Sequence, residues 1–124
     1  MIIIDSSGWI EYFSGGPLRT RYEGYLTVSG EIITPTVVLF EVYRKILRDV
    51  GKKEALTAAS YLQQTRVAPL TESVACTAAE FSIEHSLPFA DSIIYATAFE
   101  YGCGLVTSDK HFEGLPGVTY LRKD

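Results

Sequence analysis

Apolar residues along the chain fall into two kinds of pattern, short runs and longer stretches with helical spacing. Residues 1–4 form a continuous apolar run, and short segments at 31–34, 66–70, 104–107 and 118–121 also have the length and composition of strands. Between these segments, apolar residues recur every three or four positions. This spacing predicts helices over 6–13, 17–26, 36–50, 52–64, 71–85 and 91–101.

Residues at the ends of the predicted helices fit these boundaries. Ser6 or Ser7 offers an N-cap for the first helix, and Pro35 suits the first turn of the third. Pro88 breaks the chain before the last helix. Strands that alternate with helices predict an α/β domain with a mostly parallel sheet. In open sheets of this kind, ligands bind at the carboxyl ends of the strands.

The size and composition fit one globular domain over residues 1–124. The chain is 47% hydrophobic and 21% charged, so it is not expected to be disordered. We expect no membrane association, because no apolar run approaches the roughly 18 residues of a membrane span. The N-terminal sequence has no basic segment typical of a signal peptide, so we expect a cytoplasmic protein. A net charge of −4 argues against bulk electrostatic binding of nucleic acid, but allows local binding through metal ions.

Four acidic residues fall where a site is expected. Asp5 directly follows the first predicted strand, and Asp109 follows the fourth. Glu41 lies about two turns into the helix that leaves the second strand, within an apolar stretch. Asp91 starts a helix that is otherwise rich in apolar and small residues. An acid in apolar surroundings is costly unless another group compensates it.

Each of these acids also has a purely structural interpretation. Asp5 is a possible N-cap, Asp91 complements a helix dipole, Glu41 is spaced to pair with Lys45, and Asp109 suits a turn. A shared site is favoured because all four acids map to one edge of one sheet. Clustered carboxylates need protons or a cation, and an all-oxygen site suits Mg²⁺ or Mn²⁺. Such ions support hydrolysis of phosphodiesters.

Four segments around these acids carry a family resemblance: IIDSSGWI at 3–10, TPTVVLFEV at 34–42, LPFADSIIYATA at 87–98 and LVTSDKHF at 105–112. In this order and spacing, the sequence resembles the PIN-domain family and, within it, toxin ribonucleases of the VapC type. The resemblance implies a three-layer α/β/α fold with a five-stranded, mostly parallel central sheet. It also implies Mg²⁺ or Mn²⁺ as cofactor, endoribonuclease activity, a homodimer and inhibition by a small antitoxin protein.

The resemblance also implies roles for particular residues. Asp5 and Asp91 match the principal metal ligands, and Glu41 and Asp109 match the remaining catalytic acids. The hydroxyls of Thr107 and Ser108 match supporting positions.

Basic residues near the acids are candidates for contacts with the RNA substrate. These candidates are Arg44, Lys45, Arg48 and Lys110, although a solvated helix face also explains the first three. His111 follows Asp109 closely enough to touch substrate, but a surface-loop histidine is the favoured interpretation.

Several aromatic and apolar residues have two possible roles. Trp9 and Tyr12 are able to stack on bases, but packing of the first helix is favoured. An apolar groove for a partner helix is possible, with core packing as its alternative. Its candidate residues are Tyr22, Tyr25, Leu26, Leu39 and Tyr43.

Two other functions use the same fold and stay open at this point. One is a PIN-like module that binds RNA or protein without cleaving, although all four acids are retained. The other is a small-molecule phosphohydrolase, which the absence of a DxD pair after the first strand disfavours.

Overall fold

The computed structural model describes residues 1–27 and 31–123. The strands are β1 (Ile2–Ile4), β2 (Ile32–Pro35), β3 (Arg66–Ala68), β4 (Gly104–Thr107) and β5 (Val118–Tyr120). The helices are α1 (Ser6–Ser14), α2 (Arg19–Thr27), α3 (Thr36–Asp49), α4 (Lys52–Gln63), α5 (Glu72–Glu84) and α6 (Phe89–Tyr101), with a 3₁₀ turn η1 (Lys110–Phe112). The types of the five strands and six helices agree with the sequence prediction, and their boundaries move by at most two residues. The 3₁₀ turn η1 was not predicted. Pro35, which was expected in the first turn of the third helix, instead ends β2 and is the N-cap of α3.

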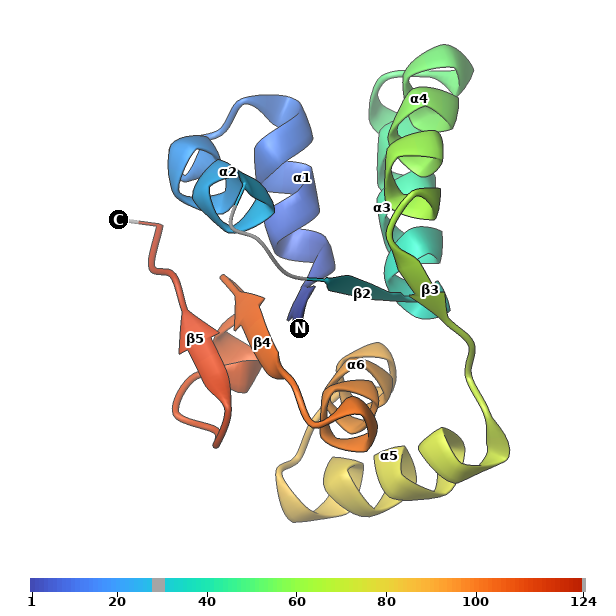
Figure 1. Ribbon diagram of the computed structural model, residues 1–124, viewed down its shortest axis with the longest axis vertical. Helices are drawn as coiled ribbons and strands as arrows, with labels where there is room; N and C mark the ends of the chain where they lie inside the picture. The colour runs from blue at the N-terminus through green and yellow to red at the C-terminus, as the bar shows by residue number, and fades with distance from the viewer. Residues whose placement is uncertain (28–30, 124) are drawn as a thin grey trace.

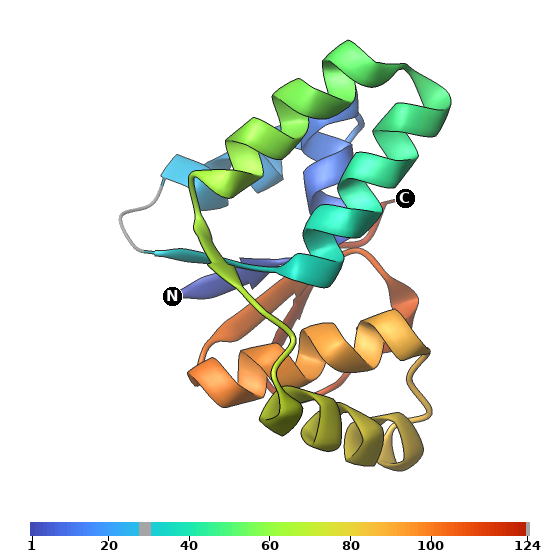
Figure 2. The same cartoon turned by 90° about the vertical axis from the view of Figure 1, so that its right-hand side faces the viewer.

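All five strands are parallel and form one sheet in the order β3-β2-β1-β4-β5. Figure 2 shows helices α1 to α4 over one face and α5 and α6 over the other, so the fold has three layers. The predicted three-layer α/β/α architecture is therefore confirmed. The chain moves outward from β1 to β2 and β3, then returns through α5 and α6 to add β4 on the other side of β1 (Figure 1). This reversal places the topological switch point between β1 and β4.

The core lies on both faces of the sheet. Ile3 and Ile33 of the central strands are fully buried, as are Trp9 of α1 and Ile94 of α6. Trp9 packs against the ring of Phe13 at a centroid distance of 5.9 Å. The packing interpretation of Trp9 is therefore confirmed, because a side chain with no exposed surface cannot stack on a base.

The start of α1 corrects one expectation from the sequence. Neither Ser6 nor Ser7 is the N-cap; Asp5 takes that position, and its side chain makes no capping hydrogen bond. The Ser7 hydroxyl instead donates to Asp5 Oδ2 at 2.9 Å. The Asp5 carboxylate is thus left for other contacts at the carboxyl edge of the sheet.

The last helix begins earlier than predicted. Pro88 is its N-cap, and α6 starts at Phe89, so Asp91 lies in the first helical turn. Because α6 leads into a parallel strand, it runs opposite to the strands, and its first turn lies at their carboxyl edge. This topology brings Asp91 to the same edge as Asp5.

Within the described residues, no helix is long and apolar enough to cross a membrane.

Candidate functional site

The centre of the candidate site is Asp5, at the end of β1. Its side chain is buried, with 2% of the residue exposed. Thr107 Oγ1 at the end of β4 donates to Asp5 Oδ2 at 2.8 Å, and Ser7 Oγ donates to the same oxygen at 2.9 Å. Two hydroxyl donors on one carboxylate oxygen fix the orientation of the group. They leave Oδ1 without a side-chain donor among the described residues.

The turn after β4 is held to the same cluster. The amide of Asp109 donates to Thr107 Oγ1 at 2.9 Å, and the amide of Ser108 donates to Ser7 Oγ at 3.1 Å. The hydroxyls of Ser108 and Tyr22 are hydrogen-bonded at 2.6 Å. Tyr22 lies in α2 and is fully buried, and burial raises its pKa to about 12, so its hydroxyl stays protonated at neutral pH.

Asp91 and Asp109 face each other across the mouth of the cluster, with His111 beside them. His111 Nδ1 lies 3.1 Å from Asp91 Oδ2 and 2.8 Å from Asp109 Oδ1. One ligand atom from each of the three residues lies within 4.8 Å of the other two, close enough to share a metal ion. The favoured surface-loop interpretation of His111 missed this contact, because sequence spacing gave no link between residues 91 and 111.

Glu41 reaches the cluster from the second turn of α3. Its Oε1 is buried and has no hydrogen-bond partner among the described residues. The alternative pairing with Lys45 is wrong, because Lys45 Nζ instead contacts Asp49 Oδ2 at 2.9 Å. A buried carboxylate oxygen without a donor is costly, and a bound cation is the simplest group that would satisfy it.

The electrostatics show that the four acids share one environment. Burial raises the pKa of Asp5, with a further increase from the charge of Asp109. Burial also raises the pKa of Glu41, and the charges of Asp5 and Asp109 add to the effect. The pKa of Asp91 rises to about 8, because of burial first, then its contact with Asp109, then the charges of Asp5 and Glu41. At neutral pH the cluster therefore retains protons unless a cation replaces them.

The donor set fits a hard divalent cation. Asp91, Asp109 and His111 offer two carboxylate oxygens and one histidine nitrogen within 4.8 Å of one another. Asp5 and Glu41 lie outside this group, but their charges act on Asp91, and no cysteine belongs to the group. Mg²⁺ and Mn²⁺ prefer such oxygen ligands, whereas structural zinc sites usually contain cysteine or several histidines. The acids and the orphaned Glu41 oxygen thus form a candidate site for Mg²⁺ or Mn²⁺.

The basic residues predicted to contact substrate do not lie together. Arg44 lines a hollow on the outer face of the α3–α4 hairpin, and Lys45 lines a different hollow next to α1. Arg48 and Lys45 both pair with Asp49 on the exposed side of α3. Lys110 is the predicted cation that directly follows an acid of the site.

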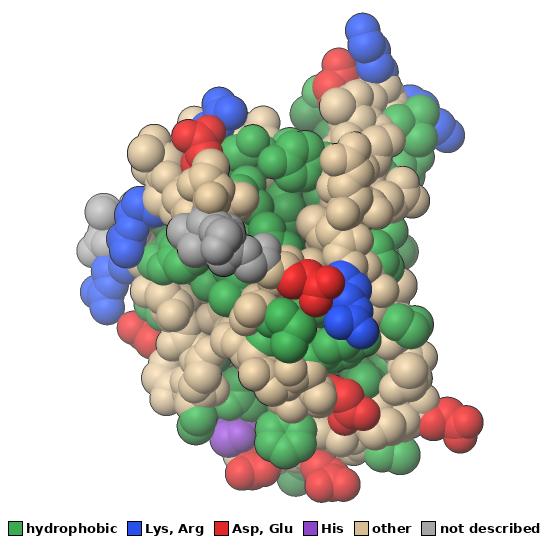
Figure 3. Space-filling model, viewed as in Figure 1, with side chains coloured by type: hydrophobic (Ala, Val, Ile, Leu, Met, Phe, Trp, Pro, Cys, Tyr) green, Lys and Arg blue, Asp and Glu red, His purple; other side chains and the backbone are tan. Residues whose placement is uncertain are grey.

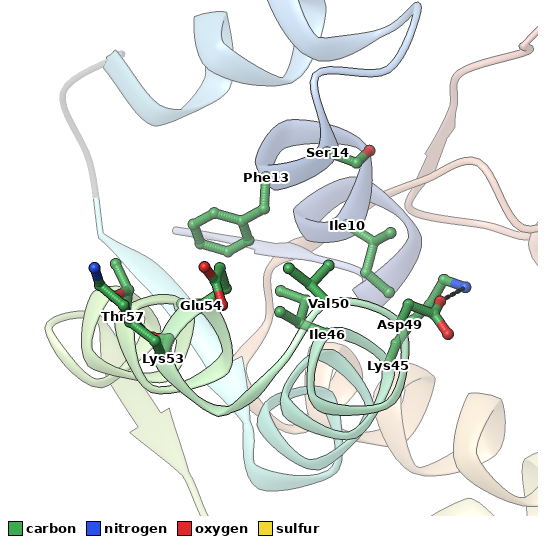
Figure 4. A pocket seen from close by; sticks show the side chains of 11 residues that line it. Ile10, Phe13, Ser14, Lys45, Ile46, Asp49, Val50, Lys53, Glu54 and Thr57 are labelled. Carbon is green, nitrogen blue, oxygen red and sulfur yellow. Dashed lines mark hydrogen bonds and ion pairs between the residues drawn. The ribbon is translucent and has the colours of Figure 1, made fainter.

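The hollow next to α1 has a volume of about 390 Å³ and lies between α1 and the α3–α4 hairpin. Figure 4 shows Ile10 and Phe13 from α1 facing Ile46 and Val50 from α3, with charged residues at the rim. On the face seen in Figure 3, apolar side chains also reach the surface between α1–α2 and α4. Core packing, the favoured interpretation of the apolar groove candidates, is confirmed for Tyr22, which is fully buried. Leu39 and Tyr43 do line a hollow, on the outer face of the hairpin.

Parallel strands with acidic residues gathered at their carboxyl edge define an α/β protein with a candidate carboxylate site. The family model described as PIN domain matches residues 2–118. The chain therefore belongs to the PIN-domain family, as the sequence motifs predicted.

Solved structures with the same fold include several toxins. A toxin–antitoxin complex from Klebsiella pneumoniae contains a chain with a TM-score of 0.83 and 22% identity, covering 96% of both chains. VapC20 of Mycobacterium tuberculosis, described as a sarcin-ricin-loop-cleaving toxin, has a TM-score of 0.82 and 21% identity, with 98% of this chain and 99% of that one covered. DNA-bound VapBC from Salmonella typhimurium has a TM-score of 0.76 and 17% identity, with 99% and 98% covered. None of the curated protein sequences compared with the chain matches it.

Proposed function

We propose that this chain is a divalent-metal-dependent endoribonuclease, and that residues 1–124 form one nuclease domain. The observation that carries the proposal is the convergence of Asp5, Glu41, Asp91 and Asp109, with raised pKa values for three of them and an orphaned oxygen on Glu41. The description of VapC20 as an RNA-loop-cleaving toxin supports RNA as the substrate class.

The residues divide into those that would hold the metal and those that orient them. Asp5 and Asp91 are the principal ligands in this proposal, and Glu41 and Asp109 complete the site directly or through water. A bound Mg²⁺ or Mn²⁺ supplies a water nucleophile and neutralises charge that develops on the phosphodiester.

The hydroxyls around Asp5 supply orientation. Thr107 fixes one Asp5 oxygen and also accepts the amide of Asp109, so one side chain sets the positions of two acids. Ser108 fixes the turn after β4 through Tyr22. Outer contacts of this kind change metal affinity or activity about 10- to 100-fold when they are removed from metal sites.

The test is metal-dependent cleavage of a mixed pool of labelled structured RNAs. The purified chain is incubated with Mn²⁺ or with chelator, beside Asp91→Asn and Asp49→Asn. Asp49 is an exposed aspartate paired with Lys45, so its substitution controls for loss of one carboxylate. We expect cleavage by the unmodified chain and Asp49→Asn only with Mn²⁺, and none by Asp91→Asn.

Two results would reject this function. RNA binding without turnover in saturating Mn²⁺ would identify a non-cleaving module. Turnover of a simple phosphomonoester with no effect on RNA would identify a small-molecule phosphohydrolase.

We also propose that the nuclease is the toxin of a type II toxin–antitoxin pair, acts in the cytoplasm and forms a homodimer. Toxin–antitoxin complexes among the structural neighbours support a small antitoxin protein as partner. The apolar hollow between α1 and the α3–α4 hairpin (Figure 4) offers that partner a surface for an apolar segment. Co-expression with the protein encoded next to it, followed by co-purification, tests the pairing, and sedimentation of the isolated chain tests the dimer.

A further inference from the structure

A further hollow, of about 410 Å³, adjoins the acidic cluster on the side of β5. Its lining residues are Ser108, Lys110, Glu113, Tyr120, Arg122 and Lys123. We call this region the basic hollow. Three of its six side chains are cationic and one is acidic, in a chain whose net charge is −4. Positive charge is therefore concentrated in the basic hollow although the chain as a whole is acidic.

The sheet register explains why the basic hollow lies beside the acids. Thr107 of β4 pairs with Tyr120 of β5, and the amide of Leu121 donates to the carbonyl of Thr107 at 2.8 Å. The residues that follow each strand therefore leave the sheet side by side, separated by roughly one strand spacing of about 4.8 Å. Along the carboxyl edge the order is Asp5 after β1, Asp109 after β4 and Arg122 after β5.

The cations of the basic hollow differ in how they are held. Lys123 Nζ lies 3.2 Å from Glu11 Oε1, and Glu11 is only 5% exposed, so this contact ties the chain after β5 to α1. Arg122 contacts Glu113 at 3.4 Å with both side chains largely exposed. Such exposed pairs contribute little free energy and exchange readily for another anion. Lys110 makes no ion pair within residues 1–27 and 31–123.

We propose that the basic hollow binds a phosphate of the RNA strand next to the phosphate that is cleaved. Lys110 and Arg122 are the cationic donors, with the hydroxyls of Ser108 and Tyr120 as further donors. This inference rests on the proposed ribonuclease function. A metal ion would neutralise the scissile phosphate, but the neighbouring phosphate would still lie near four carboxylates. Lys110 beside Asp109 and Arg122 one strand further along the edge offset that repulsion. The Arg122 guanidinium group matches phosphate oxygens in pairs.

The test compares Arg122→Gln and Lys110→Gln with Arg66→Gln. Arg66 is a matched control, because it is exposed and pairs with Glu31 at 3.3 Å, much as Arg122 pairs with Glu113. It begins β3, so it lies at the opposite edge of the sheet from the acids. Two quantities are measured: anisotropy of a labelled single-stranded oligoribonucleotide in chelator across a salt series, and steady-state cleavage in Mn²⁺.

For each hollow variant we expect the KM for RNA to rise about threefold and kcat to stay within about twofold. The slope of log Kd against log salt should weaken by about 0.7 for each cation removed, as found for single strands. Arg66→Gln should change neither quantity. Variants at 110 and 122 that behave like Arg66→Gln would overturn phosphate binding by the basic hollow and leave the proposed ribonuclease function standing. A loss of kcat at unchanged KM would do the same. An unmodified chain that neither binds nor cuts RNA would overturn the proposed function itself, and the assignment with it.

Discussion

Replacing Asp91 by asparagine should make the metal-free protein more stable while it abolishes metal binding. In the folded chain the pKa of Asp91 is about 8, mainly because the residue is 8% exposed and faces Asp109. In the unfolded chain the ordinary value of 3.8 applies. The folded state therefore binds a proton that the unfolded state releases, and stability falls as pH rises from about 4 to 8. Between the ordinary pKa of 3.8 and pH 7, the free energy of unfolding therefore falls by about 4 kcal/mol, at 1.36 kcal/mol per pH unit. Asparagine does not titrate, so the Asp91→Asn variant avoids this loss.

The assay is denaturant unfolding in chelator between pH 5 and 9. The free energy of unfolding of the unmodified chain should fall by about 1.4 kcal/mol per pH unit for each proton that only the folded state retains. The free energy of unfolding of Asp91→Asn should depend less on pH. Mn²⁺ at about 100 times its Kd should raise the free energy of unfolding of the unmodified chain by about 2.7 kcal/mol and leave that of the variant unchanged. Asp49→Asn should keep the pH dependence and the Mn²⁺ effect. A free energy of unfolding that stays constant from pH 5 to 8, or a less stable Asp91→Asn at pH 8, would refute the electrostatic argument.

Three further substitutions test the groups around Asp5. Thr107→Val removes the hydroxyl that donates to Asp5 at nearly constant volume, and calorimetry should show Mn²⁺ binding weakened about tenfold. Thr97→Val is the control, because the Thr97 hydroxyl is buried and bonds within α6, and it should not change Mn²⁺ affinity. Tyr22→Phe keeps the ring but removes the hydrogen bond from its hydroxyl to Ser108 in the turn after β4. The kcat should fall severalfold while the melting temperature changes little. Equal kcat values for the variant and the unmodified chain would show that this bond is only structural. Gly8→Ala would place a Cβ in steric conflict with the Tyr22 ring, so the free energy of unfolding should fall by about 1–3 kcal/mol. An unchanged free energy of unfolding would mean that the ring moves freely.

Much of the architecture was predictable because the patterns that encode it are local. A run such as Ile2–Ile4 cannot form one face of a surface helix, and the spacing of Val38, Val42 and Ile46 places all three on one buried face of α3. Strand order was not specified by these patterns, although it decides which chain ends meet. The family resemblance implied five mostly parallel strands, and their order became known from the structure.

The four acids were predictable for a different reason. Each follows a strand or lies in a helix connected to one, and a parallel sheet brings such positions to the same edge. The order β1-β4 then makes Asp5 and Asp109 neighbours along that edge. The contacts among them were less predictable. Tyr22 was expected to fill the core or to line a groove, and a tyrosine at helical spacing gives no sign that its hydroxyl reaches Ser108. Arg122 was missed because its proximity to Asp109 depends on the pairing of β4 with β5.

The bond between Asp5 and Thr107 joins residues 102 positions apart. A chain is synthesised from its N-terminus, so strand β1 is made well before its partner β4. Until β4 has been made, a nascent chain carries Asp5 without the Thr107 hydroxyl that orients it and without Asp109. Contacts between such distant residues also form slowly, because a long loop must close first. The carboxylate site proposed here for RNA cleavage is therefore incomplete until β4 has been made and has paired with β1.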